Sequence, residues 1–478
     1  MSQTVQGGRT RAPFADYAPT AGVYDEAFCE PGVPRPEYAA LLGDLADVDL
    51  ARLAAAVANS LSARGVQFKT AHGLLPFTVD PIPRVVSDDE WRLLEAGLVQ
   101  RARALNAFIA DVYGARSIIA AGEMPARVLE EIPHHETKLA GIQPPGGIYA
   151  HVAGIDLVRA EDGRFLVLED NLRTPSGVTY AMAARAALEE CLPVAPPTLR
   201  STSQAVELLS ETLRGAAPAG VDEPSIVLLS DGPQNSAWYE HQVLARGLGV
   251  PLVTLADLDS RNGRLRARID GALRPVDVVY RRTDEDRLRT DDGRPTALAQ
   301  ALLEPCRRGT LACVNGFGAG IGDDKLVHVY VEAMVRFYLG EEPRLRSVPS
   351  YDLAEPTALA TALDRLDALV IKPRSGSGGY GIVVCAHANR HDRQRIATAI
   401  QRSPERFVAQ ELVIFSQHPT VCDGLLEPRH VDLRPYVYSR PDQVSVLPGG
   451  LTRVAFDPGS LVVNSSQNGG GKDTWVLA

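Results

Sequence analysis

The sequence has no long hydrophobic run. Nowhere in its 478 residues does an uninterrupted apolar stretch approach the roughly 20 residues that a transmembrane helix needs. The first residues, MSQTVQGGRTRAPF, also lack the apolar core of a secretory signal. We therefore expect a cytoplasmic protein that has no membrane partner.

Cysteine is scarce and scattered. None of the six cysteines forms a CxxC pair or a Cys/His cluster with the spacing of a zinc site. We interpret all of them as reduced thiols of the core, namely Cys29, Cys191, Cys306, Cys313, Cys385 and Cys422.

Positive charge is in the minority. The 49 lysines and arginines against 59 aspartates and glutamates give a net charge of −10, which argues against nucleic acid as a partner, because nucleic acid binds basic surfaces. The hydrophobic share of 45% and the charged share of 23% are those of a globular protein, and the length suits about three domains or one composite enzyme. An anion that this chain binds must be held by a local group of basic residues.

Hydrophobic periodicity divides the chain into parts. A capping-box sequence at Ser87–Glu90 precedes apolar residues at three- and four-residue steps up to Gly114, which predicts a long core helix. Two strand-like runs follow within residues 148–168, and later strands alternate with helical runs, as in an open α/β layer. After about residue 350 the pattern changes to strands with glycine-rich connections. We therefore expect a mobile leader, an N-terminal helical segment, a strand-rich part, the open α/β layer and a last strand-rich part, at residues 1–20, 21–144, 145–203, 204–345 and 346–478.

The strongest single chemical signal is a glycine-rich loop between two short strands. In VIKPRSGSGGYGIVV, residues 370–384, the glycines let the backbone fold over an anion and aim N–H donors at it, while Lys372 adds a positive charge. The sequence is neither a Walker A motif nor a Rossmann fingerprint, because the closing Gly-Lys-Ser/Thr is missing and a strand follows the loop. The alternative interpretation is a purely structural turn.

Acidic and amide side chains give a second signal. Glu169 and Asn171 lie on one face of their strand, because alternate residues of a strand point the same way, and Asp156 on the preceding strand can complete the group. Such oxygen donors suit a Mg²⁺ ion that is held partly by nucleotide phosphates. The alternative is that these acids simply end their strands in solvent.

Basic residues on successive strands give a third signal. Asp432 and Arg434 share one strand face, Arg453 lies in the middle of the next strand, and Asn464 precedes a glycine cluster that ends at Lys472. A buried arginine is costly unless it meets an anion. Together with the lysine of the glycine-rich loop, these residues predict an electropositive floor for a triphosphate.

Taken in a rotated order, these motifs resemble the ATP-grasp ligases, bacterial glutathione synthetase in particular, with a further likeness to glutathionylspermidine synthetase. The rotation itself is similar to the circularly permuted ATP-grasp proteins of bacteria, which the terminal NSSQNGGGKDTWVL matches closely. The likeness covers roughly residues 145–478, and joining the C-terminus ahead of the strands at 148–171 restores the usual order. It implies an α/β (α+β) protein with a circularly permuted ATP-grasp fold, an additional open α/β domain of the pre-ATP-grasp kind and an N-terminal helical segment packed on the core.

The resemblance also implies ATP and Mg²⁺ as cofactors and assigns roles by position. The implied metal ligands are Asp156, Glu169 and Asn171. The residues implied to face the transferring phosphoryl group are Arg434, Arg453 and Asn464. The implied nucleotide contacts are two lysines, the glycine-rich flap and an adenine-facing hinge, namely Lys325, Lys372, Ser375, Gly376, Ser377, Gly378, Gly379, Gly381, Gln410, Glu411, Leu412 and Val413. Two departures from glutathione synthetase, Val462-Val463 in place of Arg-Gly and Arg-Ser-Gly in the flap, concern the acyl-phosphate contacts.

Polar residues of the open α/β layer are candidates for binding the acid and the amine, because ligands bind beyond the strand ends of such sheets. They are Asn235, Glu240, His241, Arg281, Arg282 and Asp284, to which the resemblance adds Asn315. The alternative is that Glu240 and His241 belong to a helix cap and that Arg281 and Arg282 are surface charges. The pair His134-His135 is interpreted as part of a surface loop.

Three functions fit these residues. The first is an ATP-dependent carboxylate–amine ligase, which would phosphorylate a small-molecule or peptide carboxylate, let an amine attack the acyl phosphate, and release ADP and phosphate. The second is a small-molecule phosphotransferase on the same nucleotide site. The third is a non-catalytic ATP-binding regulatory protein, against which the presence of Glu169, Asn171, Lys325 and Lys372 counts.

Overall fold

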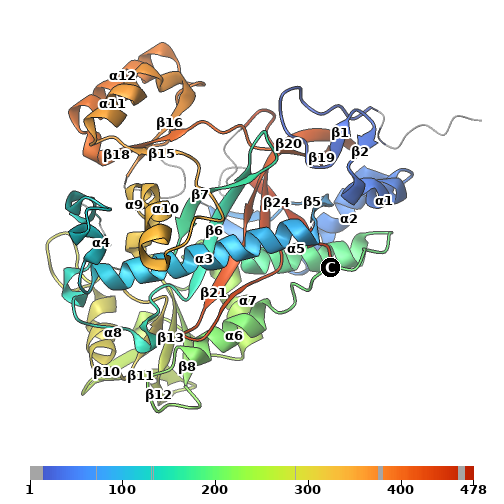
Figure 1. Cartoon of the computed structure of the whole chain (residues 1–478). Coiled ribbons are helices and arrows are strands. Elements are labelled where there is room, and N and C mark those ends of the chain that lie inside the picture. The colour runs from blue at the N-terminus through green and yellow to red at the C-terminus, as the bar shows by residue number, and fades with distance from the viewer. Residues whose placement is uncertain are drawn as a thin grey trace, which may run out of the picture.

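A large mixed sheet forms the centre of the molecule (Figure 1). The computed structural model describes residues 14, 16–70, 73–130, 132, 134–285, 287–374, 381–460 and 469–478. Within them the sheet has the order β22-β21-β6-β20-β23-β24-β5, with β7 paired to β6 and β19 paired to β20. The strands are β5 (Val79–Val86), β6 (Val152–Arg159), β7 (Phe165–Asn171), β19 (Gln417–Cys422), β20 (Leu425–Arg434), β21 (Tyr436–Ser439), β22 (Val444–Val446), β23 (Leu451–Ala455) and β24 (Gly469–Val476).

Strands from the two halves of the chain pair with each other in this sheet. The early strand β6 pairs antiparallel with the late strands β20 and β21, and β5 runs parallel to β24. The hairpin predicted within residues 148–168 is present as β6 and β7, which turn at Gly163 with a φ of 80° that favours glycine. The sheet therefore brings together the early acidic strands and the late basic strands.

Helices cover the central sheet. The predicted core helix is confirmed as α3 (Asp88–Val112), whose N-cap Ser87 accepts a hydrogen bond from the Glu90 N–H and whose apolar stripe is buried. It runs across the middle of the molecule and packs on β21 and β22, whereas α2 and α5 pack on β5 and β24 (Figure 1). The helices of this part are α1 (Pro36–Leu45), α2 (Leu50–Ala63), α4 (Ser117–Ala120) and α5 (Val178–Cys191).

The N-terminal part, predicted as helical, contributes strands as well. Besides β5 it contains two short hairpins, formed by β1 (Phe28–Glu30) with β2 (Val33–Pro34) and by β3 (Gln67–Thr70) with β4 (Gly73–Pro76). Most of the predicted leader at residues 1–20 lies outside the described residues, and the predicted division of the chain stays a prediction.

The predicted open α/β layer is present below the central sheet in Figure 1. Its parallel strands have the order β14-β13-β8-β9, and a three-stranded antiparallel meander lies beside them. The strands are β8 (Ile226–Ser230), β9 (Leu252–Val253), β10 (Leu258–Arg261), β11 (Arg264–Ile269), β12 (Ala272–Val276), β13 (Val278–Arg282) and β14 (Ala312–Val314). The helices are α6 (Ala205–Gly215), α7 (Trp238–Leu248) and α8 (Ala297–Arg307).

A small lobe of one sheet and two helices stands apart at the upper left of Figure 1. Its antiparallel strands have the order β15-β18-β16-β17, and α9 and α10 lie between it and the body. The elements are α9 (Lys325–Val329), α10 (Val331–Met334), β15 (Ser350–Asp352), α11 (Pro356–Asp364), β16 (Leu369–Pro373), β17 (Val383–Val384), α12 (Arg390–Arg402) and β18 (Phe407–Glu411). The sequence pattern did not predict α11 and α12, because α12 buries only Ile396 and Ile400 and its remaining residues are polar or small.

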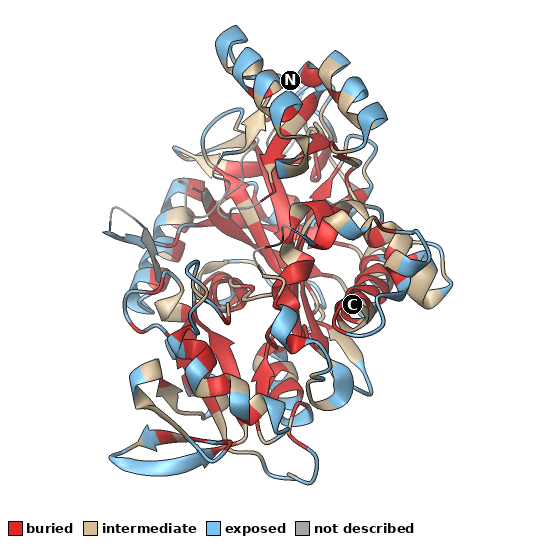
Figure 2. Cartoon of the chain, turned by 90° about the vertical axis from the view of Figure 1, so that its left-hand side faces the viewer, coloured by how far each residue is buried: buried red, intermediate tan, exposed pale blue. Residues whose placement is uncertain are grey.

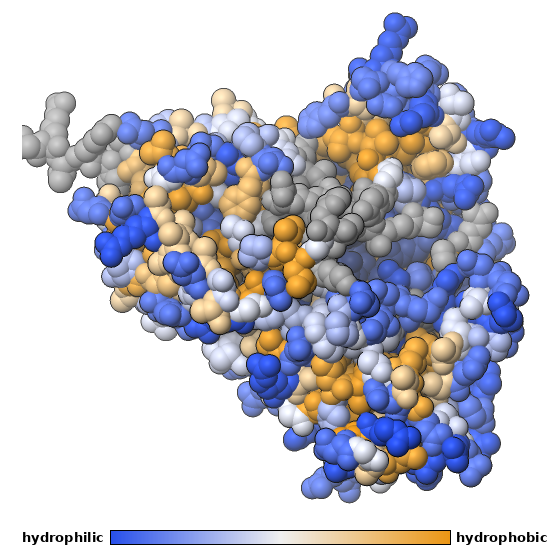
Figure 3. Space-filling model, turned by 180° about the vertical axis from the view of Figure 1, so that it is seen from behind, coloured by the Kyte–Doolittle hydropathy of each residue, from blue (hydrophilic) through white to orange (hydrophobic). Residues whose placement is uncertain are grey.

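Buried residues concentrate in the central sheet and in the parallel layer (Figure 2). On the face seen in Figure 3, hydrophobic side chains gather in separate patches rather than in one continuous band. Within the described ranges, no helix has both the length and the apolar character to cross a bilayer.

Candidate active site

One pocket gathers predicted site residues from four distant elements. Glu169 of β7, Lys325 at the start of α9, Lys372 of β16 and Gln410 of β18 all line it. Asn171 lies two residues beyond Glu169, on the same face of β7. The early acidic strand and the late basic strand therefore meet at one place, between the central sheet and the small lobe.

The register of β6 and β7 places two carboxylates opposite each other. Asp156 pairs with Glu169, and Gly154 pairs with Asn171. The glycine is required by close packing, since a Cβ at residue 154 would lie 2.9 Å from the Pro175 Cβ and 3.2 Å from the Arg434 Cδ. The loop after β7 and the Arg434 side chain are thus packed directly on the strand that carries Asp156.

Two arginines bind Asp156. Arg434 donates from Nε to Oδ1 at 2.5 Å and from Nη2 to Oδ2 at 2.7 Å, and Arg453 Nη2 donates to Oδ2 at 2.9 Å. Arg453 also donates from Nε to Asp432, its cross-strand neighbour, at 2.9 Å. Burial by itself would raise the pKa of Asp156, but Arg434 and Arg453 outweigh it and hold this pKa well below its usual range.

Lys372 is a buried base that faces charges of both signs. Only 7% of the surface of this residue is exposed. Burial, and secondarily the nearby Lys325, lower the pKa of Lys372 to about 8, although Glu169 and Asp156 act in the opposite direction. The lysine therefore carries its charge at neutral pH and lies within electrostatic reach of both predicted metal ligands.

The oxygen donors of β7 fit a Mg²⁺ ion that a nucleotide helps to hold. Glu169 supplies a half-buried carboxylate, and Asn171 has a buried Nδ2 without a hydrogen-bond partner, so its amide is not fixed by the protein. Asp156 differs, because both of its oxygens already accept hydrogen bonds from arginines. In the described parts of the chain no cluster of three or more His, Cys, Asp or Glu residues is arranged for a metal, so phosphate oxygens would have to complete this site.

The predicted adenine-facing hinge comprises the last two residues of β18 and the two residues after it. Gln410 is 3% exposed and donates from Nε2 to the Ser350 Oγ at 2.9 Å. Glu411 instead accepts hydrogen bonds from Tyr351 and Arg365, and the Leu412 N–H donates to the Ala368 carbonyl at 2.9 Å. Val413 packs against a small apolar cluster around Val158 and Phe415. All four hinge residues are described by the structure, and of the four only Gln410 lines the pocket.

Part of the predicted flap lies outside the described residues. The strands on either side of it pair antiparallel as predicted, Val370 with Val384 and Ile371 with Val383. Gly381, just before β17, has a φ of 76°, which favours glycine. The predictions that lie outside the described residues concern Ser375, Gly376, Ser377, Gly378, Gly379 and Asn464.

Lys472 pairs with an acid on another strand. Its buried Nζ forms an ion pair with Asp80 of β5 and donates to the Pro419 carbonyl at 3.0 Å. This contact ties β24 to β5 and β19, so the charge of Lys472 is balanced inside the central sheet.

A buried triad that sequence reasoning missed supports β7, and two of its members, Asp170 and His328, belong to the lining of the pocket. Asp170, between the two predicted metal ligands, points to the opposite face and accepts from Arg101 of α3 at 2.6 and 2.7 Å. Its Oδ2 also lies 2.8 Å from the His328 Nδ1 of α9. Strand alternation could have placed Asp170 on the other face of β7 from Glu169, but nothing in the sequence pairs it with Arg101 or His328. The triad fixes α3, β7 and α9 relative to one another, and with them Glu169 and Lys325.

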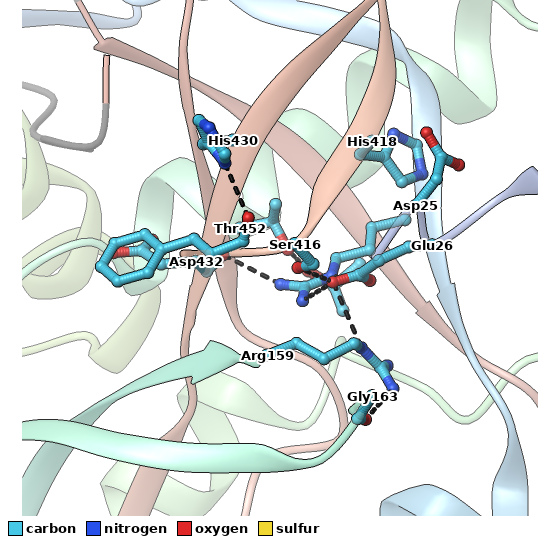
Figure 4. Close-up of polar contacts among 12 residues, drawn as sticks. Asp25, Glu26, Arg159, Gly163, Ser416, His418, His430, Asp432 and Thr452 are labelled. Carbon is cyan, nitrogen blue, oxygen red and sulfur yellow. Dashed lines mark hydrogen bonds and ion pairs between the residues drawn. The ribbon is translucent and has the colours of Figure 1, made fainter. Parts of the chain in front are cut away.

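A second charged network links the N-terminal segment to the basic strands (Figure 4). Glu26 binds Arg84 at 2.5 and 2.6 Å, lies 3.2 Å from Arg159, and accepts a hydrogen bond from Ser416. Arg84 in turn donates from Nη1 to the Asp432 carbonyl at 3.0 Å. Burial would raise the pKa of Glu26, but Arg84 and Arg159 lower it overall, so the carboxylate stays charged. The N-terminal segment thereby supports the strand that carries Asp432 and Arg434.

Several predicted substrate residues are buried and paired with one another. Arg282, 2% exposed, donates to Glu240 at 2.9 Å and to the Pro175 carbonyl and the Ser176 Oγ at 2.6 Å each. Glu240 also accepts from the Gly177 and Thr179 N–H groups at the start of α5, so it does cap a helix, as the alternative interpretation has it. The alternative that Arg281 and Arg282 are surface charges is wrong, because burial leaves them 1% and 2% exposed.

The other predicted substrate residues divide into buried and exposed ones. His241 hydrogen-bonds through Nδ1 with Ser230, and burial together with Arg282 lowers its pKa to about 2, which keeps the ring neutral. Asn315 is buried and donates from Nδ2 to the Val152 carbonyl at 2.6 Å. Asn235 donates to the exposed Asp284 at 2.9 Å, beyond the ends of β8 and β13. Substrate contact by any of these residues stays a prediction.

Neutralising Glu240 is expected to destabilise the protein strongly. The Glu240→Gln variant leaves Arg282 buried without its counter-charge, and breaking a buried ion pair costs about 3–5 kcal/mol of unfolding free energy. The matched control is Glu304→Gln, since the Glu304–Arg308 pair is about half exposed and should contribute less than about 1 kcal/mol. Urea unfolding of both variants provides the comparison, and equal small losses would contradict the structural importance of the buried pair.

The chain is similar to several known proteins. The sequence model of the family described as circularly permuted ATP-grasp type 2 matches residues 83–455. An uncharacterized protein of Synechocystis sp. is 41% identical over 465 residues, which cover 95% of this chain and 97% of that protein. A Frankia alni protein, provisionally named glutamate--cysteine ligase 2-3, is 43% identical over 465 residues, but the match covers only 54% of that protein.

A solved structure shares the fold. The apo form of a glutathione synthetase-like effector from Globodera pallida superposes with a TM-score of 0.58 over 89% of this chain and 96% of that chain. The sequence identity is 13%, so the likeness concerns the fold alone.

Proposed function

Since this chain belongs to the circularly permuted ATP-grasp family, we propose that it is an ATP-dependent carboxylate–amine ligase that forms an amide or peptide bond and releases ADP and phosphate. The observation that carries the proposal is the shared pocket of Glu169, Lys325, Lys372 and Gln410. It supplies a carboxylate for a cation and two ammonium groups for phosphates at one place. The ligase name of the Frankia relative supports the same reaction class.

The chemistry begins with a poor electrophile. A carboxylate resists attack by an amine because its leaving group would be oxide, so transfer of the γ-phosphoryl group to it creates an acyl phosphate that an amine can attack. Such a reaction needs positioning and charge neutralisation more than a nucleophile of the protein. Lys325 and Lys372 would hold the nucleotide phosphates, and Gln410 would lie against the adenine.

Mg²⁺ held by Glu169 and Asn171 would neutralise charge on the phosphates. Arg453 and Arg434 would face the transferring phosphoryl group, where a preorganised donor is worth roughly 3 kcal/mol. Asp156 and Asp432 keep these two guanidinium groups in place through the hydrogen bonds described above. In this proposal Glu169 binds the cation, whereas Asp156 and Asp432 orient the two arginines.

The amine is proposed to enter from the open α/β layer. Asp231 and Asp284 are exposed beyond the ends of β8 and β13, and Asn235 donates to both, at 3.1 and 2.9 Å. Arg282 of β13 donates a hydrogen bond to the Pro175 carbonyl. The carbonyl of the next residue, Ser176, accepts a hydrogen bond from Arg434 at 3.3 Å. An ammonium group bound near Asp231 and Asp284 would therefore be separated from Arg434 only by the segment 175–176.

The substrates are proposed to be an amino acid or a small peptide and an amine. The chain corresponds to about half of the Frankia relative, so that name does not assign glutamate or cysteine to this chain. Pooled amino acids and amines with Mg-ATP provide the test. ADP release that depends on both an acid and an amine, with a product mass that shows loss of water between them, is the expected result. A product that carries added phosphate would favour a phosphotransferase, and absence of any turnover would favour a regulatory ATP-binding protein.

Removing the charge of Lys372 is expected to weaken ATP binding about 10–100-fold. A charge-assisted hydrogen bond contributes about 1.5–3 kcal/mol, and Lys372→Met keeps the apolar stem. Because the pKa of Lys372 is about 8 in the free protein, ATP affinity should be level near pH 6–7 and fall as pH rises above 8, where the amine loses its proton.

Titration calorimetry with Mg-ATP across this pH range measures both effects. The matched control is Lys138→Met, which removes an exposed lysine and should change neither affinity nor its pH dependence. Unaltered ATP affinity in Lys372→Met, or the same decline above pH 8 in that variant, would count against the role of Lys372.

A further inference from the structure

Two cysteines meet at the edge of the parallel layer, away from the nucleotide pocket. The Cys306 Sγ at the end of α8 lies 3.6 Å from the Cys313 Sγ of β14. All six cysteines of the chain are free thiols in the structure, and among the described residues this is the one pair in contact. No step of the proposed ligase reaction uses either thiol.

Both thiols line a second pocket with largely apolar walls. Leu139, Ile142 and Tyr149 come from the segment before β6, and Phe317 follows β14. Cys306 is half-buried, whereas Cys313 is 4% exposed. The two sulfurs therefore share one largely apolar environment.

The positive charge of Arg281 acts on both thiols. The Arg281 guanidinium lies 5.2 Å from the centre of the Phe317 ring and donates to the Asn315 carbonyl at 3.3 Å. Its Nη1 is buried without a hydrogen-bond partner. The hydrogen bond from Cys306, and secondarily this guanidinium, lower the pKa of Cys313, so the buried thiol of β14 is the more acidic of the two. Thiolate character is what makes a cysteine reactive toward peroxides.

We propose that Cys306 and Cys313 are a modification site, an oxidisable thiol pair that closes a reversible disulfide when the protein meets hydrogen peroxide. The Cys313 thiolate attacks a peroxide oxygen, the O–O bond breaks, and a sulfenic acid and water result once the released hydroxide gains a proton. The Cys306 thiol then attacks the sulfenic sulfur, which forms the S–S bond and releases a second water. Two thiols thus lose two electrons and two protons, and one peroxide becomes two waters.

The geometry requires only a small movement. A disulfide bond is about 2.05 Å long, so the two sulfurs, now 3.6 Å apart, must approach each other by about 1.5 Å. The bond would close a short loop between α8 and β14. Asn315, two residues beyond Cys313, holds the Val152 and Leu172 carbonyls, so the modified strand adjoins the segment that follows the proposed metal ligands.

The test uses the full chain with Cys29→Ser, because Cys29 is exposed and would otherwise join chains together. After treatment with hydrogen peroxide, the intact mass should fall by two hydrogen atoms, and a non-reducing digest should contain Cys306 bonded to Cys313. Dithiothreitol should restore the mass. Cys306→Ser and Cys313→Ser should each abolish this loss, whereas the matched control Cys385→Ser, a buried thiol of the small lobe, should leave it unchanged.

The outcome does not depend on the ligase reaction, because mass and thiol content are measured without a substrate. Two results would overturn the proposal. In the first, a peroxide dose that oxidises the methionines leaves both thiols free, so that both are alkylated after the protein is unfolded. In the second, either cysteine is oxidised to a sulfinic acid and no cross-link forms. A disulfide that pairs either cysteine with Cys191 or Cys422 would contradict it equally.

Discussion

Replacing Glu169 by glutamine is expected to abolish ADP release while the fold stays intact. Glutamine has the same length but no charge, and an amide oxygen is a much poorer Mg²⁺ ligand than a carboxylate. Mutation of residues that merely support a metal ligand costs 10–100-fold, so loss of the ligand itself should reduce turnover by at least about 100-fold. The change also removes the negative charge that faces Lys372 in the pocket.

The fold should survive because Glu169 is half-buried at the pocket wall rather than enclosed in the core. The matched control is Glu161→Gln, which neutralises an exposed acid in the turn of the same hairpin and should leave turnover unchanged. ADP release and the Mg²⁺ dependence of ATP binding are measured for both variants, with urea unfolding as the test of the fold. Unchanged turnover in Glu169→Gln would remove the metal assignment.

The main features of the site follow from patterns with a short range along the chain. The capping box at Ser87 and the apolar stripe after it were enough to predict α3, and strand alternation placed Glu169 and Asn171 on one face. The cyclic order of motifs predicted that β6 and β7 would join the late strands, and the pairing of β6 with β20 confirms it. Motif order therefore predicted that the early and late strands would share one sheet, but it did not predict that β5 of the N-terminal part would pair with β24.

The partners of buried charges could not be predicted in this way. Asp170 meets Arg101 and His328, which lie in α3 and α9, because three elements pack together, and no spacing in the sequence encodes that contact. The same holds for Glu240, which reaches the start of α5 and Arg282. Pairings of this kind depend on tertiary packing.

Asp156 shows how the structure changes the interpretation of a predicted residue. Its position on β6 beside Glu169 suggested a metal ligand, yet Arg434 and Arg453 occupy both of its oxygens. A carboxylate between two arginines orients them and lowers their mutual repulsion. This arrangement would hold both guanidinium groups in place for the phosphoryl contact proposed above.

The Arg453→Lys variant is expected to lose about 100-fold in kcat with little change in ATP affinity. Lysine keeps the positive charge that balances Asp156 and Asp432. The Arg453 guanidinium, however, donates to both carboxylates and would have a further N–H for a phosphoryl oxygen, and a single ammonium group cannot replace all of these contacts. Loss of one preorganised donor in the transition state costs roughly 3 kcal/mol, which corresponds to the stated change in rate.

The comparison that isolates this effect is Arg429→Lys, since Arg429 is a buried arginine of the adjacent strand β20 that pairs with Glu427. Both variants replace a sheet arginine by lysine, but only Arg453 lies beside Asp156, so the loss of kcat should be confined to Arg453→Lys. Calorimetry with Mg-ATP should give the same affinity for both variants. A loss in Arg453→Lys that appears in ATP affinity with kcat preserved would mean that Arg453 binds the ground-state nucleotide, and equal losses in both variants would mean that the sheet, rather than the phosphoryl group, needs the guanidinium.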